Sequence, residues 1–339
     1  MFEKILVPLD GSDAAREILD FVIDFARPLH AEVHLITVVH PDGRLPAVAI
    51  TPEFAMAMEE EALPAEWHGV NLPLLMSESS NGPACVEPAS SDYDSVGGRS
   101  YSDLEAEARR LTGLGVASIA HIVEGSPGNE IVRAARNLGT DMIAMVTRRG
   151  SAWSRGVLGS VTDRVLHSSP IPVTVIGPRR LGVRQLGGPL REILVPLDGS
   201  YLSERAVEPA LQIAGAHEVP IRFVLVVAYS IPPFEIEPIG IIEDQAEVRG
   251  YLEAFVDDAR RRGLSADAEV LYGTAAGALV SKAGSVAGTM IVMGTRGYSG
   301  LSRWVIGSVT DKLVRSSQVP VLVIPPQVGA GESLPARQE

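Results

Sequence analysis

The sequence predicts an α/β fold of two tandem domains, each with a doubly wound sheet of five parallel strands. Two observations establish the duplication: Ile5–Ser12 recurs without change as Ile193–Ser200, and Gly159–Asp163 recurs as Gly307–Asp311. A third observation indicates the class, because short apolar strands alternate with amphipathic helices along both copies. That alternation is typical of parallel sheets covered by helices on both faces.

The repeated segments also locate an insertion. The first pair is offset by 188 residues and the second by 148, so the first copy contains 40 residues that the second lacks. They fall at about 46–100, where 53–63 is expected to form a short acidic helix and 77–100 a mobile loop. The insertion is either a tolerated surface excursion or a flap that binds a partner. We expect a first domain, a linker, a second domain and a flexible tail over 1–177, 178–189, 190–326 and 327–339.

In the first copy, Ile5–Leu9 is a short apolar strand, and the Asp-Gly-Ser that follows it has the chemistry of a turn and a helix start. Apolar residues at helical spacing then predict a helix over Ala15–Leu29. The β-branched run Val33–Val39 predicts the second strand. Helices and strands then alternate, beginning with a helix, over Tyr101–Thr112, Ser118–Val123, Asn129–Asn137, Met142–Thr147, Ser160–His167 and Val173–Ile176.

The second copy repeats this order. Its strands are expected at Ile193–Leu197, Ile221–Val227, Ala268–Leu271, Met290–Gly294 and Val321–Ile324. Ligands of doubly wound sheets bind beyond the carboxyl ends of the strands, near the point where the strand order reverses. Asp10, Asp198 and the glycines after Met293 lie at such ends, which makes them candidate site residues.

Composition narrows the class of partner. The formal net charge of −13 argues against a nucleic-acid partner, which requires a basic face. The single cysteine, Cys85, excludes an intrachain disulfide and a thiolate metal cluster. The segment Met1–Ile5 contains a charged pair and then enters a short apolar run, which is not the pattern of a secretory signal. No apolar run approaches the ~20 residues of a membrane span. We therefore expect no membrane insertion and a cytoplasmic location.

A glycine-rich loop follows the fourth strand of the second copy. It consists of Gly294-Thr295-Arg296-Gly297, nine further residues, and then Gly307-Ser308-Val309-Thr310. We expect Gly294 to leave room for a phosphate and Gly297 to take a positive φ, so that N–H groups converge on an anion. A helix that opens at Ser308 presents free N–H groups and a favourable dipole to that anion. The hydroxyls of Ser308 and Thr310 can add direct hydrogen bonds, and Arg296 can offset charge.

Each of these residues taken alone has a structural explanation as a turn, a strand end or a helix cap. Together, at the carboxyl ends of the strands of one parallel sheet, they favour an anion site. Other phosphate and hydrolase motifs are absent from the sequence: there is no Gly-Lys dipeptide, no G-x-G-x-x-G after a strand and no G-x-S-x-G. The histidines have no ligand spacing, and no nucleophile is placed with a base. We therefore expect no metal ligands and no catalytic residues.

The strand-Asp-Gly-Ser opening and the G-x₂-G-x₉-G-[ST] loop resemble the universal stress protein family in its tandem-domain form. The resemblance covers both copies, apart from the insertion and the tail, and the second copy matches the family's ATP-binding pattern in full. It implies that the domains pair through their last strands into an internal pseudo-dimer. It also implies an ATP site in the second copy. The adenine and ribose end would be lined by Pro196, Leu197, Asp198 and Val226, and the path along the ribose and phosphates by Met293, Gly294, Arg296 and Gly297. The phosphate end would be formed by Gly307, Ser308, Val309 and Thr310.

The first copy departs from that pattern. Val146 stands where the second copy has Gly294, and Arg149 where it has Gly297. We expect Val146 to push its methyl groups toward the phosphate path and Arg149 to resist a positive φ. Other residues of the pattern remain in the first copy: Asp10, Val38, Gly159, Ser160 and Thr162. This site is expected to bind a nucleotide in an altered pose or to bind nothing.

Three functions stay open at this point. The intact loop favours an ATP-binding regulatory protein without fast catalysis. A slow ATPase acting on ATP with Mg²⁺ is the second, since a bound triphosphate needs only a positioned water. The third is a scaffold that has lost nucleotide binding. We expect a homo-oligomer or a protein partner, and a division of labour in which the second half binds the nucleotide and the first half presents a surface.

Overall fold

The computed structural model describes residues 2–16, 18–39, 96–147, 158–177, 188–227, 245–295 and 306–326. Most of the expected insertion, including the helix predicted at 53–63, lies outside these ranges, as do nearly all of the linker and the tail. The loop residues Arg149, Arg296 and Gly297 lie outside them as well. Within the described ranges, no helix has the length and apolar character needed to cross a membrane.

Strands and helices alternate in both halves, as predicted. The first half contains β1 (Lys4–Pro8), α1 (Asp13–Arg16), α2 (Ile18–Leu29), β2 (Glu32–Val39), α4 (Val96–Gly113), β3 (Ser118–Glu124), α5 (Pro127–Asn137), β4 (Met142–Val146), α6 (Ser160–Ser168) and β5 (Val173–Ile176). The second half contains β6 (Glu192–Leu197), α7 (Tyr201–Glu204), α8 (Val207–His217), β7 (Ile221–Val227), α9 (Gln245–Arg261), β8 (Ala266–Tyr272), α10 (Ala275–Gly284), β9 (Thr289–Gly294), α11 (Ser308–Ser316) and β10 (Val321–Ile324).

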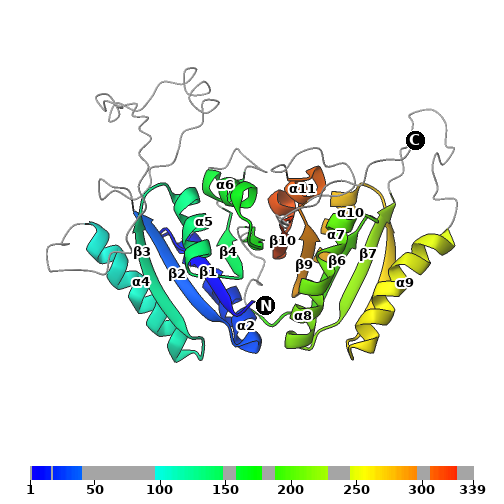
Figure 1. Ribbon diagram of the computed structural model, residues 1–339, viewed down its shortest axis with the longest axis horizontal. Coiled ribbons are helices and arrows are strands. Elements are labelled where there is room, and N and C mark those ends of the chain that lie inside the picture. The colour runs from blue at the N-terminus through cyan, green and yellow to red at the C-terminus, as the bar shows by residue number, and fades with distance from the viewer. Residues whose placement is uncertain are drawn as a thin grey trace, which may run out of the picture.

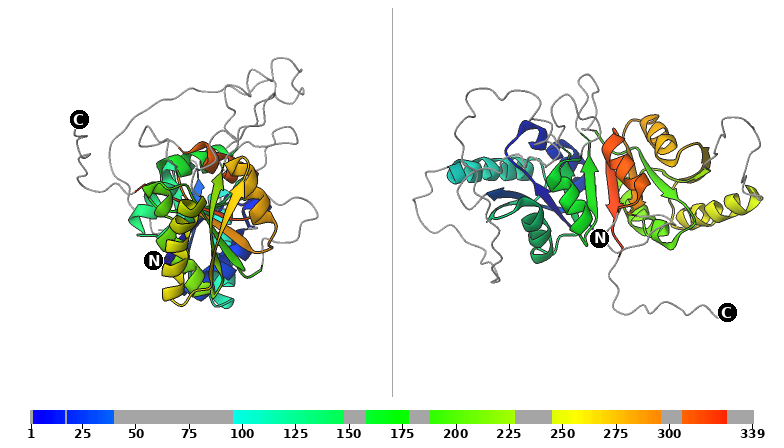
Figure 2. Two further views of the ribbon diagram at one scale, coloured as in Figure 1. Left: turned by 90° about the vertical axis from the view of Figure 1, so that its right-hand side faces the viewer. Right: turned by 90° about the horizontal axis from the view of Figure 1, so that it is seen from above.

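The strands form one ten-stranded sheet in the order β3-β2-β1-β4-β5-β10-β9-β6-β7-β8. Neighbouring strands are parallel within each half, and the halves join through β5 and β10, which run antiparallel with Val321 opposite Val175. Figure 1 shows the halves beside each other, and the view from above in Figure 2 shows β5 and β10 at the centre. The predicted pair of five-stranded parallel sheets and the internal pseudo-dimer are confirmed.

The sheet is buried on both faces. On β1, Ile5 and Val7 belong to a core covered by α2, α4, α8 and α9, whereas Leu6 belongs to a core covered by α5, α6, α10 and α11. All three side chains are 0% exposed. Each core runs through both halves without interruption. Burial on both faces explains why the strands read as nearly continuous apolar runs.

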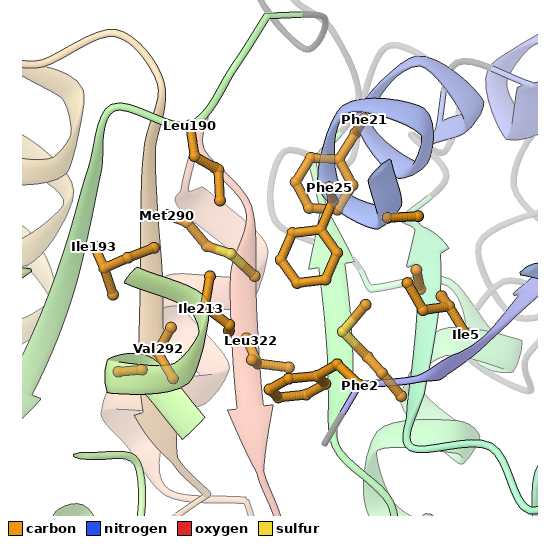
Figure 3. Close-up of a cluster of buried hydrophobic side chains, with 14 of the residues drawn as sticks. Phe2, Ile5, Phe21, Phe25, Leu190, Ile193, Ile213, Met290, Val292 and Leu322 are labelled. Carbon is orange, nitrogen blue, oxygen red and sulfur yellow. The ribbon is translucent and has the colours of Figure 1, made fainter. Parts of the chain in front are cut away.

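The contact between the halves is asymmetric in its side chains. Phe2, Phe21 and Phe25 point from the first half toward the second in Figure 3. Phe25 stacks on Phe21 with ring centroids 5.4 Å apart and meets Phe2 edge-on at 6.4 Å. The repeat places Leu190 and Ile213 where the first half has Phe2 and Phe25. Rings on one side therefore pack against smaller aliphatic side chains on the other.

Two boundaries differ from the predictions. The helix expected over Ala15–Leu29 is helical in α1 and α2, apart from residue 17, which lies outside the described residues. The loop expected over 77–100 is wrong for its last five residues, because α4 begins at Val96. Once the later turns of α4 are packed, each residue added at its start gains a helical hydrogen bond, which extends the helix. The strand expected at Ala268–Leu271 is longer, since β8 pairs with β7 along its whole length.

Candidate functional site

The carboxyl ends of β6 and β9 lie side by side where the strand order reverses. β6 pairs with β9, and β7 and β8 follow on one side while β10 lies on the other. The chain leaves β6 into α7 and α8 on one face of the sheet, and reaches α11 on the opposite face after β9. Asp198 follows β6 and Thr295 follows β9. Open parallel sheets bind their ligands at this kind of position.

The carboxylate of Asp198 organises the turn after β6. Its Oδ1 accepts hydrogen bonds from Ser200 N at 3.1 Å and from Ser200 Oγ at 2.6 Å. Between them, Gly199 has a φ of 79°, which a residue with a Cβ adopts only at a cost. Asp10 repeats the arrangement in the first half, where its Oδ1 accepts from Ser12 N at 2.9 Å. The repeated Asp-Gly-Ser therefore has a structural role in both halves.

A tyrosine that sequence reasoning missed reaches the same turn from α9. The Tyr251 hydroxyl donates to Glu204 Oε1 of α7 at 3.0 Å. Burial and the Glu204 carboxylate raise the pKa of Tyr251, while a hydrogen bond with the Gly199 backbone acts in the opposite direction. The first half has Asp103 and Arg16 at the matching positions. Tyr251 and Glu204 are 47 residues apart, so no local pattern could have paired them.

Gly294 is required by the packing of α7. A Cβ at this position would overlap the carbonyl oxygen of Leu202 and lie 3.1 Å from its carbonyl carbon. Strand alternation places Met293 in the core under α10 and α11, and position 294 on the α7 face. In the first half, Val146 likewise packs in the core of the α1 and α2 face, as does Ala15. Alternation turns this side chain away from α6, and its effect on a bound phosphate stays a prediction.

The amino terminus of α11 is fixed to the end of β9. Gly307 N donates to the carbonyl oxygen of Thr295 at 2.8 Å, and Thr310 Oγ1 donates to the carbonyl oxygens of Gly294 and Thr295 at 3.2 Å each. The expected phosphate contact of the Thr310 hydroxyl is therefore corrected: the side chain is 2% exposed and its hydroxyl faces the strand. Ser308 is exposed at the first helical position, where backbone N–H groups have no partner inside a helix.

The remaining residues of the predicted site divide between two faces of the sheet. Val226 and Met293 border the core under α10 and α11, and alternation places Pro196 on that face too. The side chain of Leu197 belongs to the opposite core and is 3% exposed. The structure thus brings Pro196, Val226 and Met293 to the face of α11, but not the side chain of Leu197.

The first half keeps the helix start and changes the strand end. Gly159 precedes α6 with φ −60° and ψ 141°, and Gly307 precedes α11 with φ −64° and ψ 148°. Asp163 N donates to Gly159 O at 2.8 Å, as the matching residue of α11 does to Gly307 O at 2.9 Å. The other retained residues occupy equivalent places, with Ser160 exposed, Thr162 buried and Val38 buried near the end of β2. The two copies therefore differ at the end of the fourth strand, not at the helix start.

Comparison with known proteins assigns the family. A model of the universal stress protein family matches residues 1–177 and 189–325. The chain belongs to the universal stress protein family. The membership confirms the resemblance inferred from the Asp-Gly-Ser motif and the glycine-rich loop. Each matched stretch contains one half of the ten-stranded sheet.

Individual relatives agree with this assignment. A universal stress protein of Methanocaldococcus jannaschii is 30% identical over 176 residues, which cover 52% of this chain and 82% of the relative. One from Mycobacterium tuberculosis is 25% identical over 228 residues, covering 64% of this chain and 75% of the relative. The crystal structure of a universal stress protein from Archaeoglobus fulgidus has the same fold, with a TM-score of 0.65 at 20% identity over 96% of this chain and 99% of that chain.

Proposed function

We propose that this universal stress protein binds ATP in its second half, at the carboxyl ends of β6 and β9, and acts as a regulatory protein without fast catalysis. The observation that carries the proposal is the fixed amino terminus of α11. Because Gly307 and Thr310 tie it to β9, the N–H groups of Ser308 and Val309 are held at the point where the strand order reverses. Such N–H groups and the helix dipole favour a phosphate group.

The other residues of the second half suit the rest of the nucleotide. Asp198 has an exposed carboxylate on the neighbouring strand end, an acceptor suited to ribose hydroxyls. Pro196, Val226 and Met293 lie on the α11 face and offer apolar atoms to a base. Arg296 completes the family pattern by adding positive charge. ATP arrives with Mg²⁺, and among the described residues no group of three or more His, Cys, Asp or Glu side chains is placed to hold a metal ion.

We propose that the first half binds ATP more weakly, or not at all. Its helix start matches that of the second half, so α6 alone does not distinguish the two sites. The distinction lies at the strand end, where Val146 replaces Gly294, and in the loop, where Arg149 replaces Gly297. The first half would then offer a surface while the second binds the nucleotide.

The test uses Ser308→Pro. Proline is tolerated at the first position of a helix, and Gly307 already has the extended backbone that a residue before proline needs. The substitution therefore removes one N–H group and one hydroxyl while α11 is kept. We expect ATP affinity, measured by calorimetric titration up to millimolar ATP, to fall at least about tenfold, the value of a hydrogen bond to a charged group.

Ser160→Pro is the matched control, because Gly159 has nearly the same backbone conformation before α6. It should leave the ATP affinity of the tighter site unchanged. Equal losses in the two variants would contradict the assignment to the second half, and a wild-type chain that binds no ATP at millimolar concentration would overturn the function. Phosphate release from ATP is measured in the same samples. Steady release that Ser308→Pro abolishes would convert the proposal into a slow ATPase.

A further inference from the structure

A pair of histidines lies on the first half of the sheet, away from the strand ends of the proposed ATP site. His34 of β2 and His121 of the edge strand β3 bring Nδ1 and Nε2 within 2.9 Å, and their rings stack with centroids 5.1 Å apart. Both side chains point to the α5 face, because His121 is in register with Ile36, two residues along β2 from His34. His34 is 4% exposed.

Two ionisable groups on neighbouring positions face the pair. Glu32 Oε1 lies 2.7 Å from His34 Nε2, close enough for an ion pair when the ring is protonated. Lys4 of β1 is in register with Glu32, and its ammonium donates to the carbonyl oxygen of Leu138 at 3.5 Å. The charged side chains of α5 itself are Glu130 and Arg133, which pair with each other, and Arg136, which is exposed.

The contact between the rings depends on their protonation. When both rings are neutral, one of the two nitrogens donates its N–H to the lone pair of the other. When both are protonated, two N–H groups and two positive charges face each other at the same distance, and Glu32 balances only one of them. Burial lowers the pKa of both histidines, and the charge of His34 lowers that of His121 further, while Glu32 acts in the opposite direction.

The second half has ion-paired side chains at the positions that match the two histidines. Arg222 and Glu269 stand where the first half has the two histidines. Arg222 pairs with Glu192 at 2.9 Å and with Glu269 at 3.2 Å, and Glu269 also pairs with Lys282 of α10 at 2.5 Å. None of these side chains is an imidazole, the side-chain type whose charge ordinarily changes between about pH 5 and pH 8. Only the first half therefore has a strand contact that changes charge in this range, among the described residues at these positions.

We propose that the His34–His121 pair makes the pairing of β3 with β2 sensitive to acid: double protonation separates the rings and loosens the edge strand of the first half. The fold lowers the pKa of both histidines from about 6.5, so the contact stabilises fully above that pH and is lost as the pH falls through the folded-state values. The strands β7 and β8 keep their pairing over the same range. Acid thus acts on one half of the molecule and spares the other.

Hydrogen exchange measured by mass spectrometry between pH 7.5 and about pH 5, corrected for the intrinsic pH dependence of exchange, tests this proposal. Protection of 118–124 should fall with decreasing pH, by up to about tenfold per pH unit for each histidine. Protection of 266–272, the matching strand β8, should stay constant and serves as the internal control. Equal losses in both strands, or none in β3, would overturn the proposal.

His121→Gln retains a hydrogen-bonding side chain that cannot become charged, so it should remove the pH dependence of β3 protection. His167→Gln, on α6 and outside the pair, is the matched control and should retain it. If His121→Gln does not fold, the imidazole C–H signals of the wild type decide by NMR titration, and midpoints at or above 6.5 for both rings contradict the proposal. Increased β3 protection on adding micromolar Zn²⁺ at pH 7.5 would also contradict it, because the pair would then be a pair of metal ligands.

Discussion

At the scale of single residues, Gly294 and Thr310 of the glycine-rich motif contact backbone carbonyl groups of the protein itself. Gly294 admits the carbonyl group of Leu202, and Thr310 uses its hydroxyl on the carbonyl oxygens at the end of β9. Both residues set the position of helices around the strand ends. A nucleotide bound there, as proposed, would meet backbone groups whose positions are already determined, which would lower the cost of ordering the site on binding.

Gly294→Val is expected to lower the free energy of unfolding by about 1–3 kcal/mol, the usual cost of overpacking, because the backbone of α7 must move. ATP affinity should fall as well, since α7 follows directly on the Asp198 turn. Urea unfolding and ATP titration of the same variant measure the two effects. Ser308→Pro separates them, because it should lower affinity at nearly unchanged stability. A Gly294→Val chain as stable as the wild type would refute the packing role.

At the scale of elements, the short helix α7 is connected to α9 by one hydrogen bond between half-buried side chains. Tyr251 donates to Glu204, and its hydroxyl also contacts the backbone of Gly199 in the turn after β6. The long helix that follows β7 is thereby coupled to the turn that contains Asp198. The first half has Arg16 and Asp103 at the matching positions, and Arg16 of α1 lies 3.8 Å from Glu107 of α4.

Tyr251→Phe should lower the free energy of unfolding by about 1–2 kcal/mol, because Glu204 loses its donor. The fold raises the pKa of Tyr251 above the unfolded value of about 10, so this stabilisation is complete below pH ~10 and is lost as the pH rises through the folded value. Ultraviolet titration of the seven tyrosines measures it, since one late-titrating group should disappear in the variant. Tyr272→Phe, which changes a side chain 55% exposed at the end of β8, should keep that late step. An unchanged late step in Tyr251→Phe would show that another tyrosine causes it.

At the scale of the whole molecule, the two halves form one body with continuous cores on both faces of the sheet. The pairing of β5 with β10 joins the two sheets. Arg315 of α11 lies 3.8 Å from Asp163 of α6, which brings these two helices into contact as well. The phenylalanines of the first half face aliphatic residues of the second, and His217 of α8 packs on Phe25 at 5.3 Å. The side chains of the first half at this contact therefore fit the different side chains of the second half, not a second copy of themselves.

Phe25→Ala is expected to lower the free energy of unfolding by about 3–5 kcal/mol, as for other buried aromatic residues. Because Phe25 lies between the halves, calorimetry should show them unfolding in separate steps, whereas the wild type unfolds in one. Phe255→Ala is the control: this ring packs on Phe223 at 5.7 Å inside the second half, and its loss should destabilise that half without separating the steps. A single transition in Phe25→Ala with a loss below about 1 kcal/mol would contradict the coupling.

The sequence by itself determined the duplication, the alternation of strands and helices, and the position of the candidate site at the strand ends. These features depend on local information. Ile5–Ser12 and its copy carry the strand, the turn with its positive-φ glycine and the helix cap within eight residues. Apolar runs and helical spacing are equally local, because burial on both faces acts on each strand separately.

Only the tertiary structure decided which side chains meet across the sheet. His34 and His121 are 87 residues apart and meet because β2 and β3 pair in one particular register. Gly294 makes room for a helix, since strand alternation turns it toward α7. Phe25 faces the second half because β5 and β10 run antiparallel at the centre. Such contacts arise from strand order and register, and the residues concerned carry no local pattern that specifies either.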